Sequence, residues 1–197
     1  MNNLQPKPYD IAFLCGRFRL IHKGHESLID TALKMCDRIL ILVGSANESG
    51  TERNPFDIET RIKMIKEIYP QDNVIVKPIS DMTNENDITP DWGRYVLKHV
   101  KTYVYKIPEL MIYGNDESRS RWFDTDDIKD VTEIIVSRSR IPISATMLRE
   151  ALLKDDKDTW FSNHNPRLHK YYDAIRGELL ATEPYSRIYQ SLVNESK

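Results

Sequence analysis

The feature that most constrains this chain is the stretch at residues 16–25, GRFRLIHKGH, which joins two segments of different periodicity. The apolar run at 11–15 before it predicts a buried strand, and residues 24–36 after it carry apolar side chains at helical spacing. Backbone N–H groups at a helix N-terminus attract anions, and the helix dipole adds to that attraction. Glycines, cationic side chains and two histidines at such a turn therefore predict a phosphate-binding site.

The rest of the chain alternates between apolar runs and amphipathic segments. Strands are predicted at 9–15, 38–43, 73–78, 110–113 and 131–137, and helices at 24–36, 57–69, 91–103 and 144–154. The run at 38–43 does not alternate, which is typical of a parallel strand buried on both faces. This order predicts an α/β fold with a Rossmann-like, doubly wound parallel sheet and right-handed crossovers.

The pattern changes after residue 157, where the chain becomes helical and rich in aromatic residues. We therefore predict a sheet domain at 1–156 and a small helical appendage at 157–197 that packs on the same domain. Its aromatic side chains have two interpretations, since they can pack on their own domain or cover an interface with another copy. They are Trp160, Phe161, Tyr171, Tyr172, Tyr185 and Tyr189.

Composition excludes several classes of protein. The formal net charge of −2 gives no basis for broad nucleic-acid or membrane affinity, and no apolar run approaches the length of a membrane span. The N-terminus lacks the apolar core of a signal peptide. Cys15 and Cys36 fall on a predicted strand and a predicted helix without metal-like spacing, so we expect free thiols in a reducing compartment. The expected location is the cytoplasm.

Three glycines follow predicted strands: Gly16, Gly44 and Gly114. In open α/β sheets, ligands bind outside the carboxyl ends of the strands, where the strand order reverses. Glycine also simply terminates strands, but here polar residues follow each one. The pattern therefore favours a ligand site at this edge.

His22 and His25 are three residues apart at the start of a predicted helix and can face the same way. One interpretation is a metal pair, although neither a third ligand nor a His-Glu-x-x-His pattern is evident. Another is a pair of polar caps. We favour phosphate binding, because imidazole N–H groups are donors where negative charge builds up during phosphoryl or nucleotidyl transfer.

A second strand-to-helix turn, ISATMLRE at 143–150, has similar chemistry. Ser144 can cap the helix, and Arg149 lies three residues after Thr146, on the same face. Taken alone, this stretch is equally well interpreted as an ordinary capped helix. Together with the first turn, it predicts a second anion site.

The two turns together, G-R-F-x-x-x-H-x-G-H at 16–25 and I-S-x-T-x-x-R at 143–149, resemble the H-x-G-H nucleotidyltransferase superfamily. The segments GSANES at 44–49 and RNPF at 53–56, followed by Glu59 and Arg61, are similar to nicotinamide mononucleotide (NMN) adenylyltransferases of the archaeal type. They also resemble the adenylyltransferase domain of bacterial proteins fused to a Nudix hydrolase. The resemblance covers about residues 9–155. No Nudix signature occurs here, so that second activity is not expected.

The resemblance implies an enzyme in which the NMN phosphate attacks the α-phosphorus of ATP to give NAD and pyrophosphate. The attacking phosphate is already an anion, so no general base is needed. Catalysis then consists of positioning and charge stabilisation, with Mg²⁺ bound through the ATP phosphates. Members of the family commonly form homo-oligomers.

Residue roles follow from the same resemblance. The expected ATP-binding residues are Gly16, Arg17, Phe18, His22, Lys23, Gly24, His25, Gly114, Asn115, Asp116, Ser144, Thr146 and Arg149. Within this set, the expected catalytic residues are His22, His25, Arg17 and Arg149.

The mononucleotide site implied by the resemblance consists of Arg53, Asp81, Met82 and Trp92. An aromatic face attracts an electron-poor pyridinium ring, so Trp92 is expected to line or stack on the nicotinamide. The alternative is that Trp92 is a core residue of its helix.

The chain also departs from the family. Related sequences usually have Gln-Pro-Phe where this chain has Arg19-Leu20-Ile21, and the loop at 81–92, which includes Asn84, Asn86 and Asp91, is longer than in the archaeal type. Because that loop is expected to touch the base, other acceptors stay open, namely nicotinate mononucleotide and phosphopantetheine. A non-catalytic nucleotide sensor is a further alternative.

Overall fold

The computed structural model describes residues 6–82, 90–114, 120–137 and 141–195. Its centre is a five-stranded parallel sheet in the order β3-β2-β1-β4-β5. The strands are β1 (Tyr9–Gly16), β2 (Cys36–Val43), β3 (Val74–Pro78), β4 (Leu110–Gly114) and β5 (Thr132–Val136). The predicted Rossmann-like sheet is confirmed, with each strand at its predicted place.

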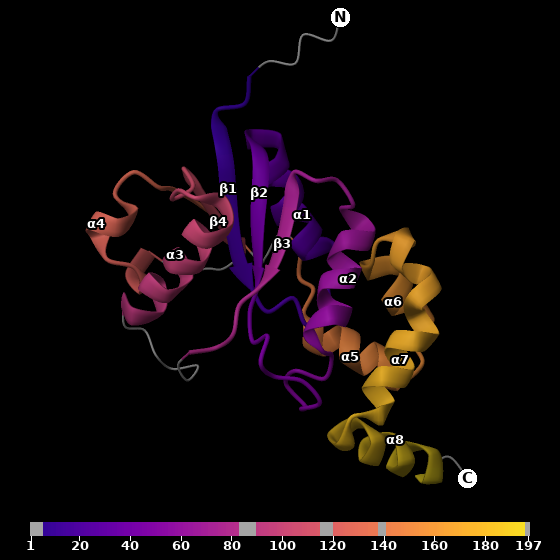
Figure 1. Ribbon diagram of the computed structural model, residues 1–197. Helices are drawn as coiled ribbons and strands as arrows, with labels where there is room; N and C mark the ends of the chain where they lie inside the picture. Colours follow the sequence, from indigo (N-terminus) through magenta and orange to yellow (C-terminus); the bar gives the residue numbers. More distant parts are fainter. Residues whose placement is uncertain (1–5, 83–89, 115–119, 138–140, 196–197) are drawn as a thin grey trace, which may run out of the picture.

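Figure 1 shows α1 (Lys23–Met35) and α2 (Ile58–Ile68) on one side of the sheet, and α3 (Pro90–Val104) with the short α4 (Thr125–Ile128) on the other. The chain runs outward from β1 through β2 to β3 and then returns to place β4 on the opposite side of β1. The strand order therefore reverses between β1 and β4. This is where doubly wound sheets bind ligands.

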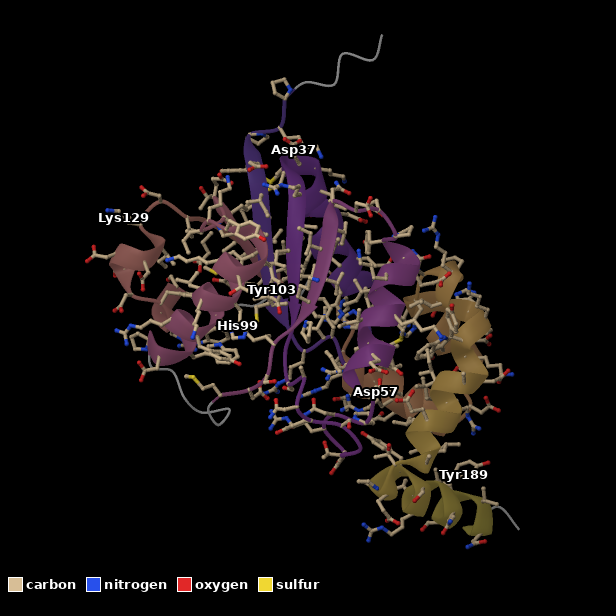
Figure 2. All side chains as sticks on the ribbon, in the orientation of Figure 1. Asp37, Asp57, His99, Tyr103, Lys129 and Tyr189 are labelled. Carbon is tan, nitrogen blue, oxygen red and sulfur yellow. The ribbon has the colours of Figure 1, made fainter. Side chains whose placement is uncertain are left out.

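The central strands are buried on both faces, as the lack of alternation at 38–43 predicted. Every residue of β2 from Ile39 to Val43 is fully buried. The predicted cap of α2 is also confirmed, because Asp57, labelled in Figure 2, accepts a 2.6 Å hydrogen bond from the Thr60 amide.

The structure changes two local assignments. Cys36, predicted on a helix, is the first residue of β2, since the chain passes from α1 into the strand without a loop. Its thiol is free, and burial raises its pKa to about 11. The short helix α4 was not predicted, because four residues carry too little periodicity to reveal a helix.

Helix α5 (Ala145–Leu153) follows β5, and the C-terminal segment from residue 157 consists of α6 (Lys157–Asn163), the 3-10 helix Pro166–Tyr171, α7 (Tyr172–Ala181) and α8 (Glu183–Glu195). In Figure 1 these helices lie beside α2, and α8 extends away from the sheet. All six aromatic side chains of the segment pack within or against the hydrophobic core of the chain. None of the helices described by the structure is both long and apolar enough to cross a bilayer.

His164 is the most deeply buried histidine of this segment, with 1% of its surface exposed. Its ring stacks on Trp160 at 3.6 Å between centroids, and Nδ1 lies 2.9 Å from the Trp160 carbonyl oxygen, which can only accept. The proton of the neutral ring is therefore on Nδ1. Burial lowers the pKa of His164 to about 4.

This lowered pKa predicts a loss of stability in acid. The unfolded imidazole takes up a proton near pH 6.5 and the folded one only near pH 4, so the free energy of unfolding falls by about 3 kcal/mol over this range. In urea denaturation at a series of pH values, the free energy of unfolding of the variant His164→Phe is expected to fall by about 3 kcal/mol less than that of the parent between pH 6.5 and pH 4. Parallel pH curves for the two proteins would contradict the prediction.

Candidate active site

A cavity of about 600 Å³ opens at the carboxyl ends of β1 and β4. Its walls come from the turn after β1, the ends of the neighbouring strands, α3 and the start of α5. Residues that line it include Gly16, Arg17, Phe18, Arg19, His22, Gly24, His25, Gly44, Arg53, Asp81, Trp92, Gly114, Trp122, Ser144 and Thr146. The structure thus brings most of the predicted site residues to one place.

Three predicted site residues do not line the cavity. Lys23 points away and donates a hydrogen bond to the carbonyl oxygen of Ser162 in α6. Met82 is half exposed. Arg149 is bonded to Thr146, which lines the cavity, but is not itself a lining residue. Asn115 and Asp116 lie outside the described residues.

The two histidine rings lie against each other at 3.9 Å between centroids, tilted by 33°, and Phe18 packs against His25 at 4.7 Å. His22 is also the N-cap of α1, because its Nδ1 accepts a 3.1 Å hydrogen bond from the Gly24 amide. In the neutral ring, the proton is therefore on Nε2. Capping and ligand binding, which the sequence presents as alternatives, are compatible, because the cap fixes which nitrogen of His22 is a donor.

Gly24 makes this arrangement possible. A Cβ atom at this position would lie 2.9 Å from Cε1 and 3.0 Å from Nδ1 of the His22 ring. A side chain would therefore push the imidazole off the helix terminus. The glycine of the H-x-G-H motif is therefore required because a larger side chain would clash with the first histidine ring.

Arg61, on α2, stabilises the turn after β1 through hydrogen bonds to main-chain carbonyl groups. It is 1% exposed, its Nη1 donates to the carbonyl oxygens of Arg17 (3.0 Å) and Gly44 (2.7 Å), and its Nη2 donates to that of Ser45 (2.9 Å). Burial lowers the pKa of this guanidinium. These bonds tie the end of β1 to the end of β2.

Arg61 also supports Arg17 through Ser45. Ser45 adopts a left-handed backbone conformation with φ 52°, and its hydroxyl accepts a 3.1 Å hydrogen bond from Arg17 Nε. This conformation is uncommon for a residue other than glycine. The Arg61 bond to the Ser45 carbonyl helps to hold it.

The departure at Arg19-Leu20-Ile21 now has a structural explanation. Arg19 Nε donates a 3.0 Å hydrogen bond to Oδ1 of Asn54, which is 1% exposed. Arg19 therefore braces the loop that carries Arg53. Leu20 and Ile21 are both fully buried, so they add to the core.

The second turn contains a capped helix and a buried cation. Ser144 accepts a hydrogen bond from the Met147 amide at 3.2 Å, which confirms the predicted cap. Arg149 Nη2 donates to Thr146 Oγ1 at 3.2 Å, so these two residues share a face. Arg149 is 7% exposed, and no carboxylate among the described residues forms an ion pair with it. This turn therefore holds a positive charge without an internal counter-ion.

Two tryptophans also line the cavity, Trp92 on α3 and Trp122 on the 3-10 helix Ser120–Trp122. Gly93 lets this short helix approach, since a Cβ there would lie 2.0 Å from the Trp122 carbonyl oxygen. Trp92 also packs against the core, as the alternative interpretation expects, and its contact with the nicotinamide ring stays a prediction. Sequence reasoning did not identify Trp122, because no periodic element marks its position.

Among the described residues, no group of three or more His, Cys, Asp or Glu side chains could hold a metal ion. The cavity instead offers cations, imidazoles and backbone N–H groups, which are donors to anions. Strand-to-helix turns rich in donors at the switch point of a parallel sheet, in one cavity with aromatic side chains, are typical of a nucleotide-binding α/β protein.

This chain belongs to the cytidylyltransferase-like family, whose sequence model matches residues 13–151, and it is a nucleotidyltransferase. Among curated relatives, the nicotinamide-nucleotide adenylyltransferase of Saccharolobus solfataricus is 27% identical over 83% of this chain and 90% of its own length. The enzyme of that name from Thermoplasma volcanium is 30% identical over 77% of this chain and 79% of its own. The resemblance to archaeal NMN adenylyltransferases is confirmed.

The fold is also similar to that of a bifunctional NMN adenylyltransferase/ADP ribose pyrophosphatase from Francisella tularensis, solved with AMP and a manganese ion. The TM-score is 0.67 at 20% identity. The match covers 95% of this chain and 56% of the bifunctional protein, so this chain spans little more than half of that relative's length. At this level of identity, the similarity concerns the fold.

The buried bonds of Arg61 predict a large effect on stability. Arg61→Leu leaves three main-chain carbonyl groups without their donor, and we expect the free energy of unfolding in urea to fall by about 3 kcal/mol. As a control, Arg38→Leu removes an exposed ion pair with Asp10 and is expected to cost less than about 1 kcal/mol. Equal losses in the two variants would contradict the role given to Arg61.

Proposed function

We propose that this protein joins ATP and nicotinamide mononucleotide to give NAD and pyrophosphate. The observation that carries the proposal is that one cavity is lined both by the turn after β1, with Arg17 and its two histidines, and by two tryptophans. A dinucleotide needs both, because its phosphates lie between two ring systems. The names of the archaeal relatives support the same reaction.

In the proposed reaction, an oxygen of the mononucleotide phosphate attacks the α-phosphorus of ATP. A new P–O bond forms, the bond between the α-phosphorus and its bridging oxygen to the β-phosphate breaks, and the electron pair leaves with pyrophosphate. The attacking group is an anion at neutral pH, so no side chain has to remove a proton. The protein contributes orientation and charge stabilisation.

The described residues suit these tasks. The amides at the start of α1, together with His22 and His25, are donors for the phosphates around the reacting phosphorus. Arg17 lies beside them, and Ser144, Thr146 and Arg149 form a second group for the departing phosphates. Mg²⁺ enters as part of the substrate, bound to the ATP phosphates.

The acceptor site is proposed to be formed by Trp92 and Trp122, together with Arg53 and Asp81, which also line the cavity. Indole faces attract a cationic pyridinium ring. Nicotinate mononucleotide has the same ring with an added carboxylate, so it is the acceptor against which specificity is tested.

The assay incubates the purified protein with ATP, Mg²⁺ and NMN, nicotinate mononucleotide or phosphopantetheine in turn, and measures pyrophosphate and the adenylylated product. We expect NAD from NMN at the highest rate. A higher rate with another acceptor would overturn the assignment of NMN. The absence of product from all three would support a nucleotide sensor instead.

His25→Ala tests the proposed donor. We expect turnover to fall by about 10² to 10³, as for the loss of one donor to a developing charge, with the melting temperature little changed. His99→Ala is the control, because His99, labelled in Figure 2, is a histidine on α3 that does not line the cavity. Near-normal turnover of His25→Ala would refute the role of His25.

Trp92→Ala tests the acceptor site. Loss of a stacking face is expected to raise KM for NMN roughly tenfold or more, because stacking contributes about 1–3 kcal/mol per base. KM for ATP should stay nearly constant. A change in KM for ATP alone would show that Trp92 faces the other substrate.

A further inference from the structure

The hydroxyl of Tyr185, in the first turn of α8, bonds to two segments of the active site. Arg149 Nε donates to it at 2.7 Å, and it donates to the carbonyl oxygen of Glu52 at 2.8 Å. A phenol has one proton, so this chain of bonds has a fixed direction, from guanidinium to hydroxyl to carbonyl. Tyr185 is 8% exposed, and its ring belongs to the hydrophobic core.

On one side, the hydroxyl fixes the orientation of Arg149. The other hydrogen bond of this guanidinium goes to Thr146, whose side chain lines the cavity, and its Nη1 is buried without a hydrogen-bond partner in the described structure. Two neutral hydroxyls, one bonded to Nε and one to Nη2, therefore hold a buried cation whose charge stays available to an anion.

On the other side, the hydroxyl holds the loop between β2 and α2. Glu52 directly precedes Arg53, which lines the cavity. The next residue, Asn54, is bonded to Arg19 of the phosphate turn. The segment around Arg53 is thus anchored by Arg19 at one end and by Tyr185 at the other.

We propose that Tyr185 is a positioning residue that holds Arg149, on the triphosphate side, and the loop bearing Arg53, on the acceptor side, in one fixed arrangement. The inference rests on the proposed function. It extends that function to α8, which lies beyond the matched family region of residues 13–151. Tyr185 acts through Arg149 and Glu52, because both hydrogen bonds of its hydroxyl go to these two residues.

The test variant is Tyr185→Phe, which keeps the ring and removes the hydroxyl. We expect kcat/KM to fall about tenfold for both ATP and NMN, the size expected for one hydrogen bond to a charged group. ATP affinity, measured by titration without the acceptor, should fall by a similar factor.

Two controls separate positioning from general loosening of the C-terminal helices. Tyr172→Phe removes another hydroxyl bond of this segment, to Asp155 at 2.7 Å, without contact to Arg149. Tyr189→Phe, one turn along α8 and labelled in Figure 2, removes a hydroxyl that makes no hydrogen bond in the described structure. Both variants are expected to keep the kinetic constants of the parent protein.

A double variant tests whether Tyr185 acts through Arg149. If it does, Tyr185→Phe should reduce ATP affinity much less in an Arg149→Lys background than in the parent, because residues that act through each other are not additive. Full additivity would overturn the inference, and so would a Tyr185→Phe variant with kinetic constants within twofold of the parent. A parent protein that makes no dinucleotide would instead refute the proposed function.

Discussion

The active site depends on one buried guanidinium. Parallel strands end side by side, but nothing in a sheet ladder determines the path of the loops beyond the last paired residues. Arg61 supplies that constraint by donating to the carbonyl groups of Arg17, Gly44 and Ser45. Because these carbonyls belong to the turns after β1 and β2, the helix α2 fixes both turns relative to each other.

This arrangement separates two kinds of cation. The N–H groups of Arg61 donate to main-chain oxygens, so this cation stabilises the fold. Arg149 is bound by hydroxyls, and Arg17 and Arg53 line the cavity. Cations of this second kind are the ones whose charge a phosphate can compensate. The two uses of arginine cannot be distinguished by residue type, only by what each guanidinium faces.

The sequence predicted the parts of the site that depend on local chemistry. The strand-to-helix turns, the caps at Asp57 and Ser144 and the shared face of Thr146 and Arg149 follow from spacing, and the structure has all of them. Contacts between distant segments could not be predicted. Arg61 lies 44 residues from Arg17 in the sequence. It is a charged residue on the apolar side of its helix, and the sequence does not show which carbonyl groups accept its hydrogen bonds.

Trp122 and Tyr185 illustrate the same limit. Trp122 reaches the cavity because Gly93 allows two backbone segments to approach each other closely. This contact depends on the three-dimensional structure and not on the spacing of residues in the sequence. The sequence pattern places Tyr185 among the aromatic residues of the appendage, and its ring does pack in the core. Its hydroxyl, which the ring pattern does not reveal, contacts Arg149 and Glu52.

The contact between Tyr185 and Glu52 closes a loop of 133 residues. During synthesis the ribosome releases the first turn, both histidines and the loop bearing Arg53 long before α8 emerges. The nascent chain therefore holds its nucleotide-binding motifs before it holds their final arrangement. Catalytic competence is expected to arise late and abruptly, when α8 docks, rather than to grow with the length of the emerging sheet.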